Sequence, residues 1–532
     1  MKKRFKNYPA PLFICACASA LLTSAALSVD ELSLLCLVSL VPLIGALTYY
    51  KAAKRLSVCG AMFTYSFLYH FLSVLWLLPF GARIEGLSAA LGVPLMFLAS
   101  VVIGLIEGAI TALAFAPCVY LRRSRVPFFL IFAALYIVAE ALQEYLPEVS
   151  FPWCRLGVIM ADVTPFIQSA SLFGSLFISL LILLINGLIA QAAVLLLGCF
   201  LPSRSSARGR RAVRLPAGIL CLACAAAVFA ADYGFGAPRI ARREASPQIV
   251  RVAAVQGGLA MQDKWDMTLS QTVSEYLELS AAAVSDGAQI ILWPETAVLA
   301  DITDSCFERI AAFASENDVT IVTGAFASER DGRRNLYYNV LCSVGLDGEV
   351  SEPYIKRRLV PMGERMPFSG LIDYGYTEPY QNLTPGSEPV LLPVDGLLAA
   401  GVVCYDSIYA SSVRDNVAAG AQLILMSSND SWFADTPAME EHFDNSVMRA
   451  VENGRWIARS GNTGVTAFID NLGRVVGRCP TDLRTYMLYD VGLFEEQTLY
   501  TRVGDVVLIP CVLLCIAAAA FIFRRERREE RC

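Results

Sequence analysis

The chain has 532 residues, of which 56% are hydrophobic, and its mean hydropathy is +0.52. A soluble protein of this length does not carry so much apolar sequence, so the composition predicts several membrane spans. The net charge of −5 and the absence of a basic stripe outside the short segments that flank the apolar stretches argue against a nucleic-acid-binding protein. The chain has two histidines, His70 and His442, which excludes a histidine-rich zinc site and leaves a Ser-His-Asp triad open only through His442.

Apolar stretches long enough to cross a bilayer lie on both sides of a block of mixed polarity. We predict eight spans, at residues 9–29, 32–50, 58–80, 87–120, 126–146, 168–200, 215–233 and 504–523. The chain therefore divides into a seven-helix membrane bundle (1–234), a soluble domain (235–500), and a C-terminal span with a basic tail (501–532).

Lysine and arginine gather in alternate connecting segments. They cluster at residues 2–6, 51–55, 122–125, 204–214 and 524–531, whereas the other short loops hold only Arg83 and Arg155. Because cytoplasmic loops carry the excess of basic residues, we expect both termini in the cytoplasm and the soluble domain on the opposite side. The same pattern favours retention of the first apolar stretch over its removal as a signal peptide.

Strand-like and helix-like segments alternate through the soluble block, which predicts a layered α/β domain. Helical periodicity is found at 266–286 and 440–459. Strand patterns are found at 249–256, 288–293, 319–324, 337–344, 349–355, 397–403, 422–426, 463–470 and 474–476. Asp347-Gly348 predicts a hairpin between two of these strands.

Three residue types needed for thiol acyl transfer each follow a strand-like run: Glu295, Lys356 and Cys404. Taken alone, each has a simpler interpretation. Glu295 could be a carboxylate in a turn, Lys356 could belong to a solvated basic run with Arg357-Arg358, and Cys404 could be a thiol in the core. Together they fit one site, because strand ends can converge on one edge of a sheet. A thiol is a nucleophile, a carboxylate can take its proton, and an ammonium can stabilise an oxyanion.

These motifs resemble those of the nitrilase superfamily, and with apolar spans on both sides the chain resembles the bacterial apolipoprotein N-acyltransferase family. The resemblance covers nearly the full length. It depends on Trp293-Pro294-Glu295, Tyr354-Ile355-Lys356, Val403-Cys404-Tyr405, Ser428-Asn429-Asp430 with Trp432-Phe433, His442-Phe443, and Phe151-Pro152-Trp153. It implies an αββα sandwich between the seventh and eighth of eight spans.

The resemblance also assigns roles by matching position. Glu295 corresponds to the general base, Lys356 to the oxyanion stabiliser and Cys404 to the nucleophile. Glu364 corresponds to the residue that orients the lysine, and the backbone N–H of Tyr405 to an oxyanion-hole donor. The lipid-contact positions correspond to Trp432, Phe433 and Trp153, although ordinary core packing explains Trp432 and Phe433 equally well.

The sequence departs from the family pattern at three places near these motifs. After Trp153, the family's usual Gly-Tyr-Ser-Gln run is replaced by Gly157-Val158-Ile159-Met160. Asp406 stands where the family usually has Glu, and Ala434 stands where it usually has Gly. The side chain of Asp406 is one methylene shorter than that of Glu, so the sequence does not predict which contact it makes. The polar and aromatic segment 371–383 is interpreted either as a mobile arm over the site or as a plain loop.

The implied activity is transfer of a fatty acyl chain from a phospholipid, through a cysteine thioester, to the N-terminal amine of a diacylated apolipoprotein at the bacterial inner membrane. The resemblance implies no cofactor and no metal. One alternative is a membrane-tethered amidase of the same superfamily, which needs only a single anchor. A second is a transporter with a degenerate domain, since Glu107, Glu140 and Glu144 fall in or near spans.

Overall fold

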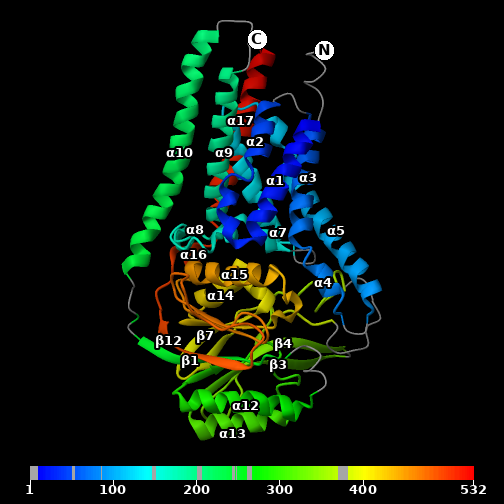
Figure 1. Ribbon diagram of the computed structural model, residues 1–532, viewed down its shortest axis with the longest axis vertical. Coiled ribbons are helices and arrows are strands. Elements are labelled where there is room, and N and C mark those ends of the chain that lie inside the picture. The colour runs from blue at the N-terminus through cyan, green and yellow to red at the C-terminus, as the bar shows by residue number, and fades with distance from the viewer. Residues whose placement is uncertain are drawn as a thin grey trace. The chain divides into compact units, whose positions relative to one another are not determined.

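The computed structural model of the chain describes residues 10–50, 54–84, 87–146, 151–200, 207–242, 246, 248–259, 267–332, 334–369 and 382–531. It forms two compact units, one of Met1–Arg239 with Asp505–Cys532 and the other of Ile240–Gly504 (Figure 1).

The first unit is helical. Its α-helices are α1 (Ala10–Ser28), α2 (Val41–Tyr49), α3 (Arg55–Ser73), α4 (Leu77–Gly81), α5 (Ala89–Ala114), α6 (Cys118–Leu121), α7 (Phe128–Glu144), α8 (Ala170–Phe173), α9 (Ser175–Phe200), α10 (Ala207–Arg242) and α17 (Leu508–Arg531). Short 3₁₀ helices are η2 (Asp30–Leu37), η3 (Pro152–Cys154) and η4 (Leu156–Met160).

Within the described residues, six helical segments rather than eight have the length and apolar composition of a membrane span. They are Ala10–Ser28, Asp30–Tyr49, Ala89–Leu121, Ser175–Cys199, Val213–Arg242 and Leu508–Glu529. The predicted spans at 58–80 and 126–146 are helices α3 and α7, but neither qualifies. Helix α7 has 17 residues and buries Glu140 and Glu144, and α3 buries Ser66 and His70. Helix α7 is therefore too short, whereas the polar side chains of α3 lower its apolar character.

The helix predicted at 32–50 is interrupted between η2 and α2, and a side chain forms hydrogen bonds with the backbone groups left free there. Asn186 of α9 accepts a hydrogen bond from the Leu40 N–H at 2.8 Å and donates one to the Cys36 carbonyl at 2.8 Å. A buried backbone group without a partner costs about 1–3 kcal/mol, so this amide makes the irregular segment tolerable inside the bundle.

The second unit contains two six-stranded sheets. One has the order β12-β1-β2-β3-β4-β5 and the other β11-β10-β9-β8-β7-β6. The strands of the first sheet are β1 (Gln248–Gln256), β2 (Ile290–Leu292), β3 (Thr320–Asp331), β4 (Arg334–Val344), β5 (Tyr354–Ile355) and β12 (Thr485–Leu493). Those of the second are β6 (Leu391–Val394), β7 (Leu397–Val403), β8 (Leu423–Ser428), β9 (Ile457–Gly461), β10 (Ala467–Ile469) and β11 (Val475–Arg478).

Helices cover the outer face of each sheet, which gives the αββα order of layers (Figure 1). Helices α12 (Leu269–Ser285) and α13 (Cys306–Asn317) cover the first sheet, and α14 (Ala410–Ala418) and α15 (Ala438–Asn453) cover the second. The short helices η6 (Cys404–Ile408), η7 (Asp430–Phe433) and α16 (Leu499–Val503) complete the unit.

Alternation along the strands explains why both faces of the first sheet are apolar. On β1, Val252 and Ala254 enter the core between the sheets, whereas Ala253 and Val255 enter the core under α12 and α13. Successive side chains of a strand point to opposite faces, so a continuous apolar run fits a strand buried on both sides.

One of the predicted helices is too long, whereas the predicted hairpin is present. The helix predicted at 440–459 ends at Asn453, because Gly454 takes a left-handed conformation (φ 61°) and β9 begins at Ile457. The predicted hairpin around Asp347-Gly348 is confirmed, because Val344 pairs antiparallel with Val350 beside the turn, and Tyr354 and Ile355 of β5 pair antiparallel with β4. The predicted arm at 371–383 lies, apart from its last two residues, outside the described residues.

Candidate active site

The three predicted residues lie just beyond the carboxyl ends of strands in the two facing sheets. Glu295 follows β2, Lys356 follows β5, and Cys404 directly follows β7. Strands β1, β2 and β3 run parallel, as do β7, β8 and β9. The carboxyl ends of parallel strands meet at one edge of a sheet, which is where α/β domains form their sites.

Lys356 is held between two carboxylates. Its Nζ lies 2.9 Å from Oε1 of Glu295 and 2.8 Å from Oε1 of Glu364, and its side chain is 1% exposed. Burial alone would lower the pKa of Lys356, but the negative charges of Glu295 and Glu364 raise it well above its usual value. Lys356 therefore stays an ammonium, which can stabilise negative charge but cannot act as a base.

Neutral donors complete the coordination of the two carboxylates. The amide of Asn339 donates to Oε1 of Glu295 at 2.8 Å and to Oε1 of Glu364 at 3.0 Å. The N–H groups of Asn429 and Val360 donate to Oε2 of Glu295 and of Glu364, at 3.0 and 2.8 Å. Every one of these contacts gives a hydrogen to an oxygen, which is the environment of an ionised carboxylate.

Cys404 is buried and carries a neutral thiol at rest. Burial raises the pKa of the Cys404 thiol well above its usual value, the charge of Glu295 raises it further, and Lys356 opposes the shift. The charges of Glu295 and Lys356 thus both act on this thiol. A thiol of this kind must lose its proton as it attacks, and the carboxylate of Glu295 is a suitable acceptor.

Asp406 connects the segment that carries the lysine to the segment that carries the cysteine. Its Oδ1 accepts the N–H of Arg358 at 2.7 Å, and its Oδ2 accepts the hydroxyl of Tyr354 at 2.9 Å. Tyr354 and Arg358 flank Lys356 in the chain, so the shorter acid makes two hydrogen bonds across the sheets. Burial raises the pKa of Asp406 to about 6, opposed chiefly by the charge of Lys356.

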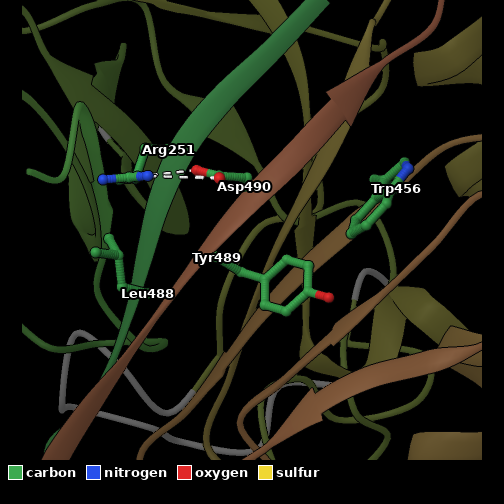
Figure 2. A pocket seen from close by; sticks show the side chains of 5 residues that line it. All are labelled: Arg251, Trp456, Leu488, Tyr489 and Asp490. Carbon is green, nitrogen blue, oxygen red and sulfur yellow. Dashed lines mark hydrogen bonds and ion pairs between the residues drawn. The ribbon is translucent and has the colours of Figure 1, made fainter. Parts of the chain in front are cut away.

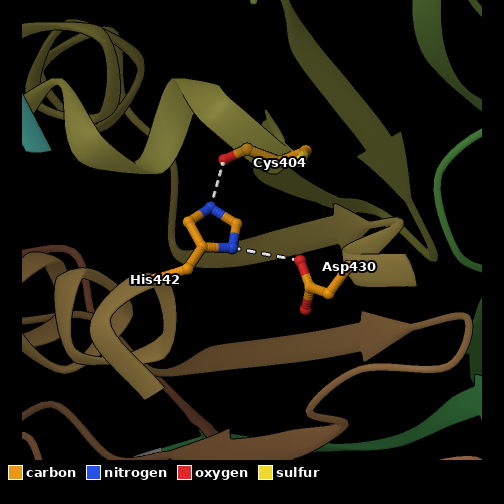
Figure 3. Close-up of side chains that lie close together, drawn as sticks. All are labelled: Cys404, Asp430 and His442. Carbon is orange, nitrogen blue, oxygen red and sulfur yellow. Dashed lines mark hydrogen bonds and ion pairs between the residues drawn. The ribbon is translucent and has the colours of Figure 1, made fainter. Parts of the chain in front are cut away.

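Behind Cys404 lies a buried network that the sequence indicated only as a motif. The His442 imidazole lies between the carbonyl oxygen of Cys404, 3.2 Å from Nε2, and the carboxylate of Asp430, 3.0 Å from Nδ1 (Figure 3). Arg459 contacts the same carboxylate at 2.8 Å. Burial opposes ionisation of Asp430, but Arg459 and then His442 hold the pKa of its carboxyl well below the usual range.

The same residues could in principle form a Ser-His-Asp triad or a metal site, but their geometry argues against both. Ser407 Oγ lies 3.0 Å from His442 Nε2, so Ser407, His442 and Asp430 have the spacing of a hydrolytic triad, but Ser407 is fully buried. Cys404, Asp430 and His442 also have potential metal-binding atoms within 4.8 Å of one another. The guanidinium of Arg459 already lies against Asp430 and 3.1 Å from His442 Nδ1, and its positive charge disfavours a cation there.

The remaining predicted residues have different surroundings. The Tyr405 ring packs edge-on against Tyr409, with ring centroids 5.5 Å apart. Phe433 is buried against the His442 ring at 5.3 Å, whereas Trp432 is half-buried. Trp153 belongs to the helical unit, where it packs against Trp76, so its predicted contact with lipid stays a prediction.

A hollow of about 620 Å³ lies elsewhere in the same unit (Figure 2). It is lined by Arg251, Trp456, Leu488, Tyr489 and Asp490. Arg251 on β1 faces Asp490 on β12 across the strand pair and forms an ion pair at 2.8 Å. None of these residues belongs to the Glu295, Lys356 and Cys404 cluster.

Comparisons with known proteins match both units. A family model described as "Carbon-nitrogen hydrolase" matches residues 251–497, and one described as "Apolipoprotein N-acyltransferase N-terminal domain" matches residues 19–188. The solved structure of an amidase from Nesterenkonia sp. is 19% identical, with a TM-score of 0.36, over 49% of this chain and 95% of that chain.

Curated relatives named "Apolipoprotein N-acyltransferase" extend over most of the chain. The relative from Methylococcus capsulatus is 30% identical over 75% of this chain and 74% of its own length. The relative from Pseudomonas putida is 30% identical over 72% of each chain, and that from Geobacter metallireducens is 29% identical over 74% of each.

The domain of the second unit is therefore a nitrilase-like domain of the carbon–nitrogen hydrolase class, as expected from its motifs. The chain as a whole belongs to the apolipoprotein N-acyltransferase family. It is accordingly a membrane-embedded bacterial acyltransferase.

Replacement of Gly324 tests how closely the Glu295 turn must be held. A Cβ at this position of β3 would lie 2.5 Å from the Thr296 nitrogen and 2.7 Å from the Glu295 Cα. We expect Gly324→Ala to displace Glu295 and to lower the acyl-transfer rate about 100-fold. Gly45→Ala, where nothing lies within 4 Å of the new Cβ, is the matched control. An unchanged rate in Gly324→Ala would show that the turn is not constrained.

The raised pKa of Asp406 predicts a pH dependence. As pH falls through about 6, the carboxylate takes a proton and loses an acceptor for the Arg358 N–H, which loosens the segment next to Lys356. We expect the rate at pH 5 to be about tenfold below that at pH 7, because one unit below the pKa about a tenth of the group is ionised. Asp406→Asn should lack this inflection, and Asp415→Asn should keep it. An inflection near pH 6 that persists in Asp406→Asn would assign it to another group.

Proposed function

We propose that the protein transfers a fatty acyl chain from a phospholipid to the N-terminal amine of a diacylglyceryl-cysteine in an apolipoprotein, which completes a triacylated lipoprotein. Phosphatidylethanolamine is the donor we favour. The observation that carries the proposal is the Lys356 ammonium between Glu295 and Glu364, with the thiol of Cys404 within their electrostatic reach. The names of the relatives support the choice of substrates.

In the first half-reaction, Cys404 Sγ attacks the carbonyl carbon of the donor ester and its proton passes to Glu295. Lys356 and the backbone N–H of Tyr405 stabilise the oxyanion. When the C–O bond breaks, Glu295 returns the proton to the leaving lysophospholipid alkoxide. The enzyme then holds the acyl chain as a thioester.

In the second half-reaction, the neutral α-amine of the apolipoprotein attacks the thioester carbon. Glu295 takes a proton from the nitrogen, the C–S bond breaks, and the departing thiolate recovers a proton from Glu295. No water is consumed and no cofactor is needed. Glu364 keeps Lys356 in place through both steps, since their side chains meet at 2.8 Å.

The membrane arrangement is part of the proposal. We assign the bundle to residues 1–234, the catalytic domain to 235–500 and the closing helix with its tail to 501–532. We count α3 and α7 as additional spans with polar inner faces, which gives eight. The basic residues at 51–55 and 122–125 support cytoplasmic termini and an extracytoplasmic domain at the inner membrane. Trp153, Trp432 and Phe433 are the proposed lipid contacts.

The thioester is the direct test. Purified protein incubated with phosphatidylethanolamine should gain the mass of one fatty acyl group, and hydroxylamine should remove it, because thioesters are cleaved by this nucleophile. In Cys404→Ser an adduct, if formed, should be an ester that resists the same treatment. No adduct on a folded wild-type protein supplied with phospholipid would contradict the donor step. Release of ammonia from small amides by the same sample would instead indicate the amidase alternative.

A further inference from the structure

The backbone at Cys404 is held in an uncommon conformation. Its φ of 47° lies in the left-handed region, which a residue with a Cβ rarely adopts because of steric strain. The residue lies at the junction between β7 and η6, where the chain turns sharply out of the sheet. Such a conformation persists only when neighbouring contacts hold it.

His442 provides one such contact. Its Nε2 is 3.2 Å from the carbonyl oxygen of Cys404, and its side chain is fully buried (Figure 3). A carbonyl oxygen can only accept, so a hydrogen bond at this position requires that Nε2 carry the hydrogen, which it shares between this carbonyl and Ser407 Oγ at 3.0 Å. Asp430 and Arg459 contact the other ring nitrogen, at 3.0 and 3.1 Å, and fix the plane of the ring.

The carbonyl of Cys404 and the N–H of Tyr405 belong to one peptide unit. That unit is planar and trans, so the two groups point in opposite directions. A contact that fixes the direction of the carbonyl therefore also fixes the direction of the Tyr405 N–H, the proposed oxyanion-hole donor. A rotation of this peptide would move that donor away from the developing negative charge.

We propose that His442 is a positioning residue that orients the Tyr405 N–H by holding the carbonyl of Cys404. The inference rests on the proposed role of Cys404 as the nucleophile. His442 acts through the backbone and does not exchange a proton with the substrate, because its side chain is fully buried.

Two substitutions separate the two ends of the imidazole. The side-chain amide nitrogen of His442→Gln can reach the position of Nε2, whereas that of His442→Asn reaches only as far as Nδ1. We expect single-turnover acylation by phospholipid to fall about 100-fold in His442→Asn, which is the usual cost of losing an oxyanion-hole donor. His442→Gln should acylate about tenfold faster than His442→Asn.

Alkylation of Cys404 by iodoacetamide supplies the second measurement, because this reaction develops no oxyanion. We expect the alkylation rate in both variants to stay within a few-fold of wild type. The loss would then be specific to the acylation rate. Equal losses in both reactions, or His442→Asn acylation at the wild-type rate, would overturn the inference. A wild-type protein that is alkylated but never acylated would overturn the proposed function itself, which distinguishes the two failures.

Discussion

A buried ammonium between two carboxylates is the interaction on which the rest of the site depends. Removing an ammonium and a carboxylate from water costs several kcal/mol each, and the cost is recovered only when geometry and further hydrogen bonds are good. The surroundings of Lys356 meet this requirement. Asn339 donates to both Glu295 and Glu364, and backbone N–H groups occupy their outer oxygens. The same arrangement fixes the positive charge of Lys356 near the neutral thiol of Cys404. That charge stabilises the negative charge that develops on the oxyanion during the reaction.

The αββα architecture brings these groups together from distant parts of the chain. Glu295 comes from one sheet and Cys404 from the other, and the core between the sheets fixes their separation. Asp406 and Tyr354 join the two sheets directly at this edge. One turn holds Cys404, the proposed nucleophile, in a left-handed conformation, and the turn after Glu295 places Thr296 at a φ of 49°. The domain thus stabilises two strained turns where the chemistry is proposed to occur.

Sequence patterns predict the parts of this structure that depend on residues close together in the chain, such as the strands and the residues that follow them. Glu295, Lys356 and Cys404 follow apolar runs, and those runs are strands because their side chains alternate between two apolar layers. The end of α15 is less predictable, since the apolar pattern continues through Trp456-Ile457 after the helix ends before Gly454.

In the helical unit, polar groups on α3 and α7 have partners that the sequence does not indicate. Arg155, for example, pairs with Glu144 of α7 at 2.6 Å. Long-range partners such as Asn339 and His442 leave no periodic signal, because strand pairing within the first sheet brings Asn339 to Glu295, and the packing of α15 on the second sheet brings His442 to Cys404.

The central claim is that Glu295 removes the proton of a thiol whose pKa is raised, and the pH dependence of Cys404 alkylation tests it most directly. The account predicts that Glu295→Gln reacts with iodoacetamide about 100-fold more slowly than wild type at pH 7. The gap should narrow as pH rises, because hydroxide then replaces the missing base. The extent of reaction is read from the mass of the peptide that carries Cys404. Equal rates at pH 7, or a gap that stays constant at all pH values, would contradict the assignment of Glu295 as the base.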